Sequence, residues 1–146
     1  MQLGEGRRFS EGEHSTPAVQ SELVASLAEA RLSERERLAL DRFTELLRDR
    51  LGYELVSLWL YGSRARGEAS GPESDIDLMV ITRGGREHDF DRVLAAALEA
   101  EPLMTGEGTI LAPFVADPAW IAGRREIESF FMREVDRDKI VLEGEG

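Results

Sequence analysis

The chain lacks cysteine altogether, so disulfide bonds and thiolate chemistry are excluded from its function. It also has no long apolar run, because none approaches the roughly 20 residues that a membrane-spanning helix needs. Residues 1–13 lack the apolar centre of a signal peptide. We therefore expect a protein that is neither exported nor embedded in a membrane and that works in the cytoplasm.

Positive charge is scarce as well. The chain has 29 acidic and 18 basic residues, a net charge of −11, and Lys139 is its only lysine. A surface this acidic repels nucleic-acid backbones, which excludes broad binding along DNA or RNA phosphates. The two histidines, His14 and His88, have no companions at metal-ligand spacing, so we interpret both as solvated surface residues.

The 146 residues are enough for one domain with a real core, and 42% of them are hydrophobic. Residues 1–16 contain almost no apolar side chains and predict a mobile tail, whereas residues 17–32 have the apolar spacing of a short leading helix. A single domain is expected over residues 33–146. Its first helix begins with a capping box, in which Ser33 is followed three residues later by Glu36.

Periodicity and turn residues predict the elements that follow this helix. Residues 53–61 are rich in Val, Leu, Trp and Tyr and predict a buried strand. A loop at residues 70–73 separates it from a second strand at residues 75–82. An amphipathic helix is expected over residues 89–101, and a third strand over residues 109–116.

The last part of the chain predicts an edge strand and one more helix. Pro113 cannot donate a backbone hydrogen bond, which indicates an edge position or a bulge in the third strand. Asp117 with Pro118 at the next position is typical of a helix start, and Gly123 weakens that helix in the middle. Residues 140–142 form either a short final strand or a packed tail. The apolar residues of the helix are Trp120, Ile121, Ile127, Phe130 and Phe131.

Two acidic residues stand one residue apart at the start of the second strand. In a strand, alternate side chains share a face, so Asp75 and Asp77 are expected on the same face. Like charges at neighbouring same-face positions repel, and Asp is rare in strands. Magnesium, which proteins bind through one or two carboxylates together with substrate phosphates, would offset this repulsion.

A Gly-Ser turn lies between the two strands. Gly62 lets a ligand approach the backbone, and N–H groups at a following helix start form an anion site for phosphates near Ser63. A purely structural alternative stays open at this point. In that case Gly62 and Gly67 only serve turns, and Asp75 and Asp77 are simply exposed at the mouth of the strand.

These residues together resemble a known signature. Gly62-Ser63, eleven intervening residues and Asp75-x-Asp77, with Gly67 between them, are similar to the motif of the DNA polymerase beta-type nucleotidyltransferase superfamily. The chain looks most like the minimal nucleotidyltransferases, which are often paired with HEPN proteins in toxin–antitoxin modules. The resemblance covers the chain from about residue 51 onward. It implies an α+β fold like the polymerase beta palm, with helices packed on a small mixed β-sheet.

The resemblance also implies roles for individual residues. Asp75 and Asp77 would be the catalytic ligands of magnesium, with manganese as an alternative, and the substrate would be ATP or another nucleoside triphosphate. An acceptor hydroxyl would attack the α phosphate, and pyrophosphate would leave. The residues expected to bind the nucleotide are Gly62, Ser63, Arg64, Arg66 and Ser74. The alternative for the two arginines is an ion pair with Glu68, Glu73 or the catalytic acids.

The third strand departs from the pattern. Active members of the superfamily carry a third carboxylate there, which acts as general base and metal ligand, but residues 109–116 contain no acid. Glu107, just before the strand, is the candidate third acid, and its alternative is a solvated loop residue. Asp117, just after the strand, already has a role as helix cap. A missing third acid should weaken deprotonation of the acceptor without abolishing nucleotide binding.

Two functions remain open beside the structural alternative. The first is a magnesium-dependent enzyme that transfers AMP or another nucleoside monophosphate to a hydroxyl. The second is a catalytically weak or inactive antitoxin-like subunit that binds nucleotide and a partner. The small size and the acidic surface favour an acceptor on a second protein, for which the resemblance implies a HEPN-type partner. Exposure of Trp120, Phe130 or Phe131 would indicate an interface, and an oligomer stays open.

Overall fold

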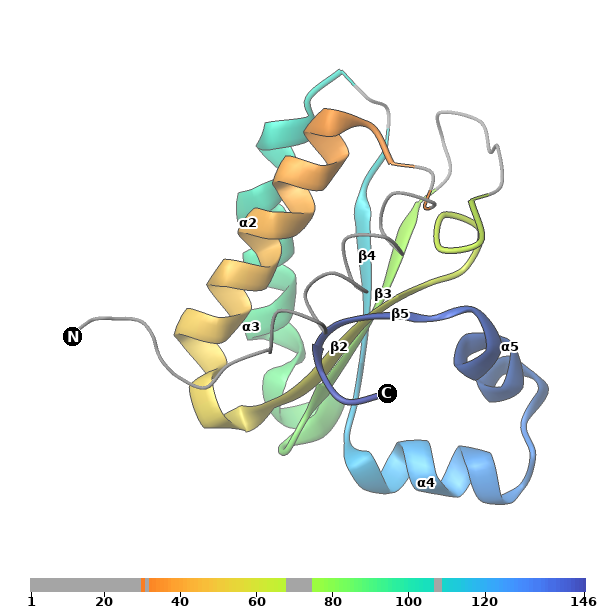
Figure 1. The fold of residues 1–146 in the computed structure, drawn as a ribbon. Coiled ribbons are helices and arrows are strands. Elements are labelled where there is room, and N and C mark those ends of the chain that lie inside the picture. The colour runs from red at the N-terminus through yellow and green to blue at the C-terminus, as the bar shows by residue number, and fades with distance from the viewer. Residues whose placement is uncertain (1–29, 31, 68–74, 107–108) are drawn as a thin grey trace.

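The centre of the protein is a four-stranded sheet with the order β4-β3-β2-β5 (Figure 1). The computed structural model describes residues 30, 32–67, 75–106 and 109–146. β2 pairs antiparallel with both β3 and β5, whereas β3 and β4 run parallel. This mixed sheet with helices packed on it confirms the predicted α+β fold. The strands are β2 (Leu55–Tyr61), β3 (Ile76–Thr82), β4 (Leu111–Ala116) and β5 (Ile140–Gly144).

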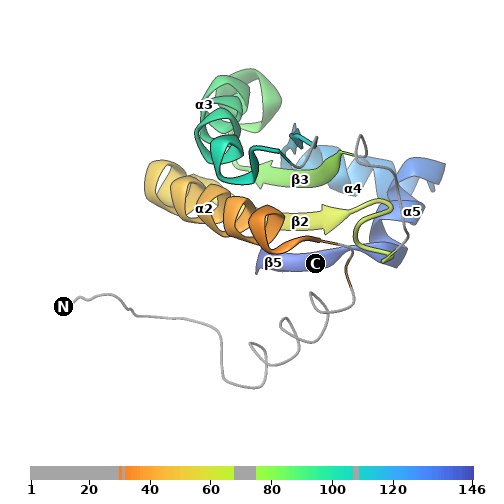
Figure 2. The same cartoon turned by 90° about the horizontal axis from the view of Figure 1, so that it is seen from above.

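Helices cover both faces of the sheet. One pair of helices lies side by side on one face, and a second pair lies on the other (Figures 1 and 2). The first pair is α2 (Glu34–Leu51) and α3 (Gly85–Ala100), and the second pair is α4 (Pro118–Glu126) and α5 (Phe130–Asp138). Short 3-10 turns at Gly52–Glu54 and Glu101–Met104 follow α2 and α3. None of the described helices is long and apolar enough to cross a membrane.

The alternation of side chains along β3 builds two apolar clusters. Ile76, Leu78 and Val80 belong to the larger cluster, on the side of α2 and α3. Met79 and Ile81 belong to the smaller one, on the side of α4 and α5. Since successive strand residues point to opposite faces, β3 also presents Asp77 on the α4 and α5 face.

The start of α2 confirms the predicted capping box. The Ser33 hydroxyl accepts a hydrogen bond from the Glu36 backbone N–H at 3.1 Å. In return, the Ser33 N–H donates to Oε1 of Glu36 at 2.9 Å. These two bonds satisfy backbone donors that the first turn of a helix leaves without intrahelical partners.

Two helices replace the single one expected after the third strand. The chain breaks between α4 and α5, where Glu128 has φ 55° and the Ser129 hydroxyl accepts from the Met132 N–H at 3.3 Å. The predicted weak point, Gly123, lies inside α4, so that prediction is wrong. The break turns the chain back, which allows Met132 and Val135 of α5 to bury against the sheet.

The two edge strands of the sheet test the predictions for Pro113 and for residues 140–142. β4 is an edge strand, which confirms the position indicated by Pro113. β5 forms the opposite edge, so the end of the chain is a strand and not a packed tail. α3 begins at Gly85, four residues before its predicted start. The predicted tail at residues 1–16 and, apart from Ala30 and Leu32, the predicted leading helix lie outside the described residues.

Candidate functional site

Asp77 lies at the centre of the site that the motif indicates. It pairs across the sheet with Tyr61, the last residue of β2, and with Ala112 of the parallel strand β4. Its side chain is half-buried, whereas Asp75, immediately before β3, is exposed. The strand pairing therefore brings the Asp-x-Asp segment beside the turn that follows β2.

The electrostatics of Asp77 favour a cation. Burial raises the pKa of its carboxyl, the Asp75 carboxylate raises it further, and Arg66 partly opposes both effects. Burial and the Asp77 carboxylate also raise the pKa of Tyr61 to about 12, so this phenol stays neutral at physiological pH. A partly buried carboxylate that repels a neighbouring one is stabilised when a positive ion binds between them.

The Asp77 carboxylate lies directly against the backbone of Gly62. A Cβ at Gly62 would overlap Oδ2 of Asp77 and lie 3.3 Å from its Cγ. Gly62 also has φ +80°, in the left-handed region that side chains rarely adopt. Two backbone hydrogen bonds close the turns that follow. The Arg66 N–H donates to the Gly62 carbonyl and the Gly67 N–H donates to the Arg64 carbonyl, both at 3.2 Å. The sequence motif thus corresponds to a real close approach.

Replacing Gly62 with Ala should both destabilise the fold and disturb the Asp77 carboxylate. The left-handed φ alone costs about 1–2 kcal/mol with a Cβ present, and the overlap forces Asp77 to move. Gly52→Ala is the matched control, because Gly52 has φ +52° but nothing within 4 Å of an added Cβ. Urea unfolding should register both variants, whereas only Gly62→Ala should weaken nucleotide binding. Equal nucleotide affinity of the two variants would contradict the predicted role of the Gly62 contact.

The Arg64 side chain forms a buried ion pair with Glu36 of α2. Its side chain is 6% exposed and donates to Oε1 of Glu36 at 2.7 Å, and the Glu36 side chain is 5% exposed. Oε2 of Glu36 accepts from the Thr109 hydroxyl at 2.9 Å. Glu36 therefore links the start of α2, the turn after β2 and the approach to β4. This contact gives Arg64 a structural role, and its contact with the nucleotide stays a prediction.

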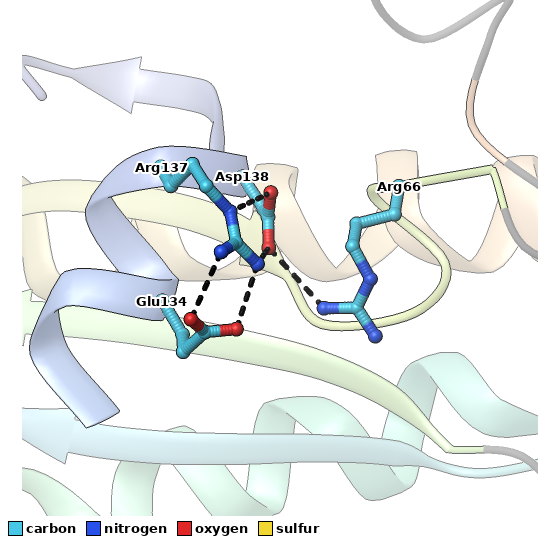
Figure 3. Close-up of polar contacts among 4 residues, drawn as sticks. All are labelled: Arg66, Glu134, Arg137 and Asp138. Carbon is cyan, nitrogen blue, oxygen red and sulfur yellow. Dashed lines mark hydrogen bonds and ion pairs between the residues drawn. The ribbon is translucent and has the colours of Figure 1, made fainter. Parts of the chain in front are cut away.

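Arg66 lies closer to the carboxylates and pairs with α5. Its Nη1 lies 3.2 Å from Oδ2 of Asp138 at the end of that helix (Figure 3). Arg137 approaches the same carboxylate at 2.9 Å and also donates to both carboxylate oxygens of Glu134. Because Arg66 lowers the pKa of Asp77, its charge acts at the site as well. The role of Arg66 toward phosphate stays a prediction.

The remaining predicted residues fall into two groups. Ser63 lies in the turn beside Gly62 and is partly exposed, consistent with its predicted place next to the phosphates. Ser74 and Glu107 lie outside the described residues, so the structure says nothing of their roles. Asp117 caps α4 as expected, because its Oδ1 accepts from the Trp120 N–H at 2.7 Å.

The position beside Asp77 on the third strand is occupied by a small apolar residue. In the parallel pairing of β3 and β4, Ala112 is the partner of Asp77 and Phe114 is the partner of Met79. None of the three β4 residues on this face, Ala112, Phe114 and Ala116, carries a carboxylate. Across the described residues, no group of three or more His, Asp or Glu side chains could hold a metal ion by itself.

A comparison with protein families decides the identity of this arrangement. A family model described as a nucleotidyltransferase domain matches residues 40–118, which is more than half of the chain. The match includes the Gly-Ser turn, both carboxylates and the whole of β4. The chain belongs to the nucleotidyltransferase domain family. This membership confirms the resemblance to the polymerase beta-type superfamily, whereas the minimal nucleotidyltransferase subfamily stays a prediction. No curated protein matches the chain.

The nucleotidyltransferase site fits a divalent cation. Domains of this family generally use a nucleoside triphosphate and a divalent metal. The candidate donors are the carboxylates of Asp75 and Asp77, and burial together with the Asp75 charge raises the pKa of Asp77. Hard cations such as magnesium prefer oxygen ligands and complete their coordination with substrate phosphates and water. Two carboxylates alone do not complete the coordination of a divalent cation, so the nucleotide phosphates would have to supply further oxygen ligands.

Three residues around the site were not found from the sequence as parts of it. The sequence predicts Glu36 only as half of a capping box, whereas in the structure it also binds Arg64. Asp138 carried no signal, since it lies 72 residues from Arg66 in the chain. The sequence predicts Phe131 as a helix residue and, if exposed, as part of an interface, whereas its contacts with Tyr61 and Phe114 arise only in the folded protein.

Proposed function

We propose that this nucleotidyltransferase transfers a nucleoside monophosphate, with ATP as donor, to a hydroxyl on a partner protein. The observation that carries the proposal is the contact between the Asp77 carboxylate and the Gly62 backbone. This contact joins the carboxylate pair to the turn that would bind the triphosphate. Family membership supports nucleotidyl transfer as the general reaction.

The residues of the site would divide the work between binding and positioning. The backbone at Gly62 and the Ser63 hydroxyl would hold the β and γ phosphates. Asp75 and Asp77 would bind magnesium or manganese, whose positive charge would neutralise the triphosphate. The acceptor oxygen then forms a bond to the α phosphorus, the bond from that phosphorus to pyrophosphate breaks, and the hydroxyl proton passes to Glu107 where it acts as the base, or otherwise to water. In-line positioning supplies most of the catalysis in this scheme.

A partner protein is the acceptor that the surface favours. Ile127 and Phe130, at the junction of α4 and α5, are 66% and 72% exposed. Exposed apolar side chains that cluster in one region are typical of protein interfaces. The net charge of −11 disfavours a nucleic-acid acceptor. A HEPN-type protein, modified on a hydroxyl such as that of tyrosine, is the partner we propose.

The test is transfer of label from the α phosphate of ATP. The protein is incubated with magnesium, α-labelled ATP and a candidate HEPN-type partner, and label on the partner is followed over time. We expect magnesium-dependent labelling that Asp77→Ala abolishes. Nucleotide binding without labelling would favour a binding subunit instead. Absence of any binding at millimolar nucleotide, measured by calorimetry, would overturn both functions.

A second candidate function, a nucleotide-binding subunit with little activity, is favoured by Ala112. The residue that pairs with Asp77 on β4 has no acid to deprotonate the acceptor. Ala112→Asp would place a carboxylate beside Asp77 on the same face of the sheet. General bases contribute about 10²–10⁴-fold to rate, so we expect this variant to raise transfer at least about ten-fold.

Glu107→Gln is the complementary variant for the same measurement. If the third acid is absent, Glu107→Gln leaves transfer unchanged and Ala112→Asp raises it. If Glu107 already acts as the base, Glu107→Gln lowers transfer and Ala112→Asp brings no gain. The second pattern would contradict the weak-activity interpretation and support the full enzyme.

A further inference from the structure

An aromatic cluster covers part of the sheet face that carries Asp77. The Phe131 ring on α5 contacts the Tyr61 ring edge-on, with centroids 5.8 Å apart and an interplanar angle of 88°. The same ring lies 5.7 Å from the Phe114 ring at 34°. Phe114 in turn lies 5.2 Å from the Trp120 ring. These contacts hold Phe131 in one position from both sides.

Strand register places Phe131 directly over β3. Tyr61 is on β2 and Phe114 is on β4, and these two strands flank β3 in the sheet. Their pairing partners on β3 are Asp77 and Met79. A ring that contacts both flanking aromatics must therefore cross above the stretch from Asp77 to Met79. Phe131 forms an aromatic wall next to the carboxylate that the proposed function assigns to the metal.

Part of this wall remains open to a ligand. The Phe131 side chain is 38% exposed although its ring is fixed by two neighbours. One exposed ring is far smaller than the roughly 1,200–2,000 Å² buried in a stable protein interface. It matches one planar heterocycle, and every nucleobase has a π face that stacks on aromatic side chains. Phe130 is more exposed, at 72%, and belongs to the surface proposed for the partner.

We propose that Phe131 is the nucleobase-stacking residue of the site. Resting on the proposed function, this assignment places the base of the triphosphate on α5 while its phosphates reach the turn at Gly62. The cluster with Tyr61 and Phe114 fixes the ring in advance, so little side-chain freedom is lost on binding. Stacking of this kind tolerates all bases, which implies that Phe131 contributes affinity without selecting adenine over guanine.

The experiment compares ligands with and without a base, in the presence of magnesium. Affinities for ATP, GTP and inorganic tripolyphosphate are measured by calorimetry for the wild type and Phe131→Ala. We expect Phe131→Ala to weaken ATP and GTP about ten-fold, because stacking of one base is lost, with tripolyphosphate unchanged. Phe130→Ala, at the neighbouring and more exposed position, should bind all three like the wild type. Phe131→Trp should restore nucleotide affinity.

Each other outcome has a distinct meaning. If wild-type protein binds ATP and Phe131→Ala binds it equally well, the stacking role is overturned and the proposed function stands. Equal losses for ATP and tripolyphosphate would also overturn it, since the effect would then arise at the phosphates. If the wild type binds none of ATP, GTP and tripolyphosphate, the proposed function itself fails. Should Phe131→Ala not fold, Phe131→Leu keeps the apolar contact and must show the same loss for nucleotides.

Discussion

Replacing Asp77 with Asn is expected to reduce nucleotidyl transfer by about 10³-fold. A bound divalent ion contributes several kcal/mol of charge stabilisation in a transition state, and each 1.36 kcal/mol corresponds to a factor of ten. The amide keeps the size of the side chain, so its neighbour Gly62 is not disturbed. At the same time the variant should be slightly more stable than the wild type without metal, because burial and Asp75 disfavour the Asp77 anion.

The opposite signs of these two effects make the measurement specific. Transfer of α-phosphate label gives the first effect, and urea unfolding in the presence of a chelator gives the second. Asp91→Asn is the matched control, since Asp91 is exposed on α3, on the other side of the sheet. It should change neither quantity. Loss of both transfer and stability in Asp77→Asn would indicate a structural carboxylate and contradict the metal-binding role.

Replacing Arg64 with Ala is expected to destabilise the fold by about 3–5 kcal/mol, because it leaves the Glu36 charge buried without its partner. Total stabilities of single domains are about 5–15 kcal/mol, so such a loss is a large fraction. Arg66→Ala is the control on the same turn. Its ion pair with Asp138 is partly exposed, with Arg66 at 32%, and should be worth at most about 1 kcal/mol.

A double variant shows whether the loss of stability in Arg64→Ala comes from the unpaired charge of Glu36 or from the lost packing of the Arg64 side chain. Glu36→Gln with Arg64→Met removes both charges and keeps a side chain at Glu36 that can complete the capping box. We expect urea unfolding to place this double variant well above Arg64→Ala in stability. A double variant as unstable as Arg64→Ala would show that packing, and not the unpaired charge, causes the loss.

The same pair gives stability a pH dependence with a definite sign. Burial alone would raise the pKa of Glu36, but hydrogen bonds from Arg64, the Ser33 N–H and Thr109 outweigh it, and the net pKa is lowered below its ordinary value of 4.5. A lowered pKa means that the unfolded chain takes up the proton first. The contribution is therefore present above pH 4.5 and is lost as pH falls through the lower value. Glu36→Gln should flatten that part of the curve.

The role of Arg64 changes how the motif works in this protein. The turn after β2 carries two arginines, and the structure assigns them to different tasks. Arg64 fastens the turn to α2 through Glu36, and Glu36 also binds Thr109 before β4. Arg66 remains on the surface beside the carboxylates. The turn that follows β2 is thus held by a buried ion pair to α2.

Features that depend on neighbouring residues could be predicted from the amino-acid sequence. The capping box of Ser33 and Glu36, the two central strands and the Gly-Ser turn all follow from local spacing and turn chemistry. The spacing of Gly62, Asp75 and Asp77 was also enough to predict the family and nucleotidyl transfer as its general reaction. Local patterns carry this information because hydrogen bonds within a helix or turn join residues only a few positions apart.

Contacts between residues far apart in the chain became known from the folded structure. The partner of Arg64 lies 28 residues away and that of Arg66 lies 72 residues away, distances at which periodicity carries no information. The break before α5 turns Phe131 back over β3, and the parallel pairing of β4 places Ala112 beside Asp77. These contacts arise from the packing of whole elements against the sheet. The motif therefore indicated nucleotidyl transfer, whereas strand order and helix packing decided which residues surround Asp77.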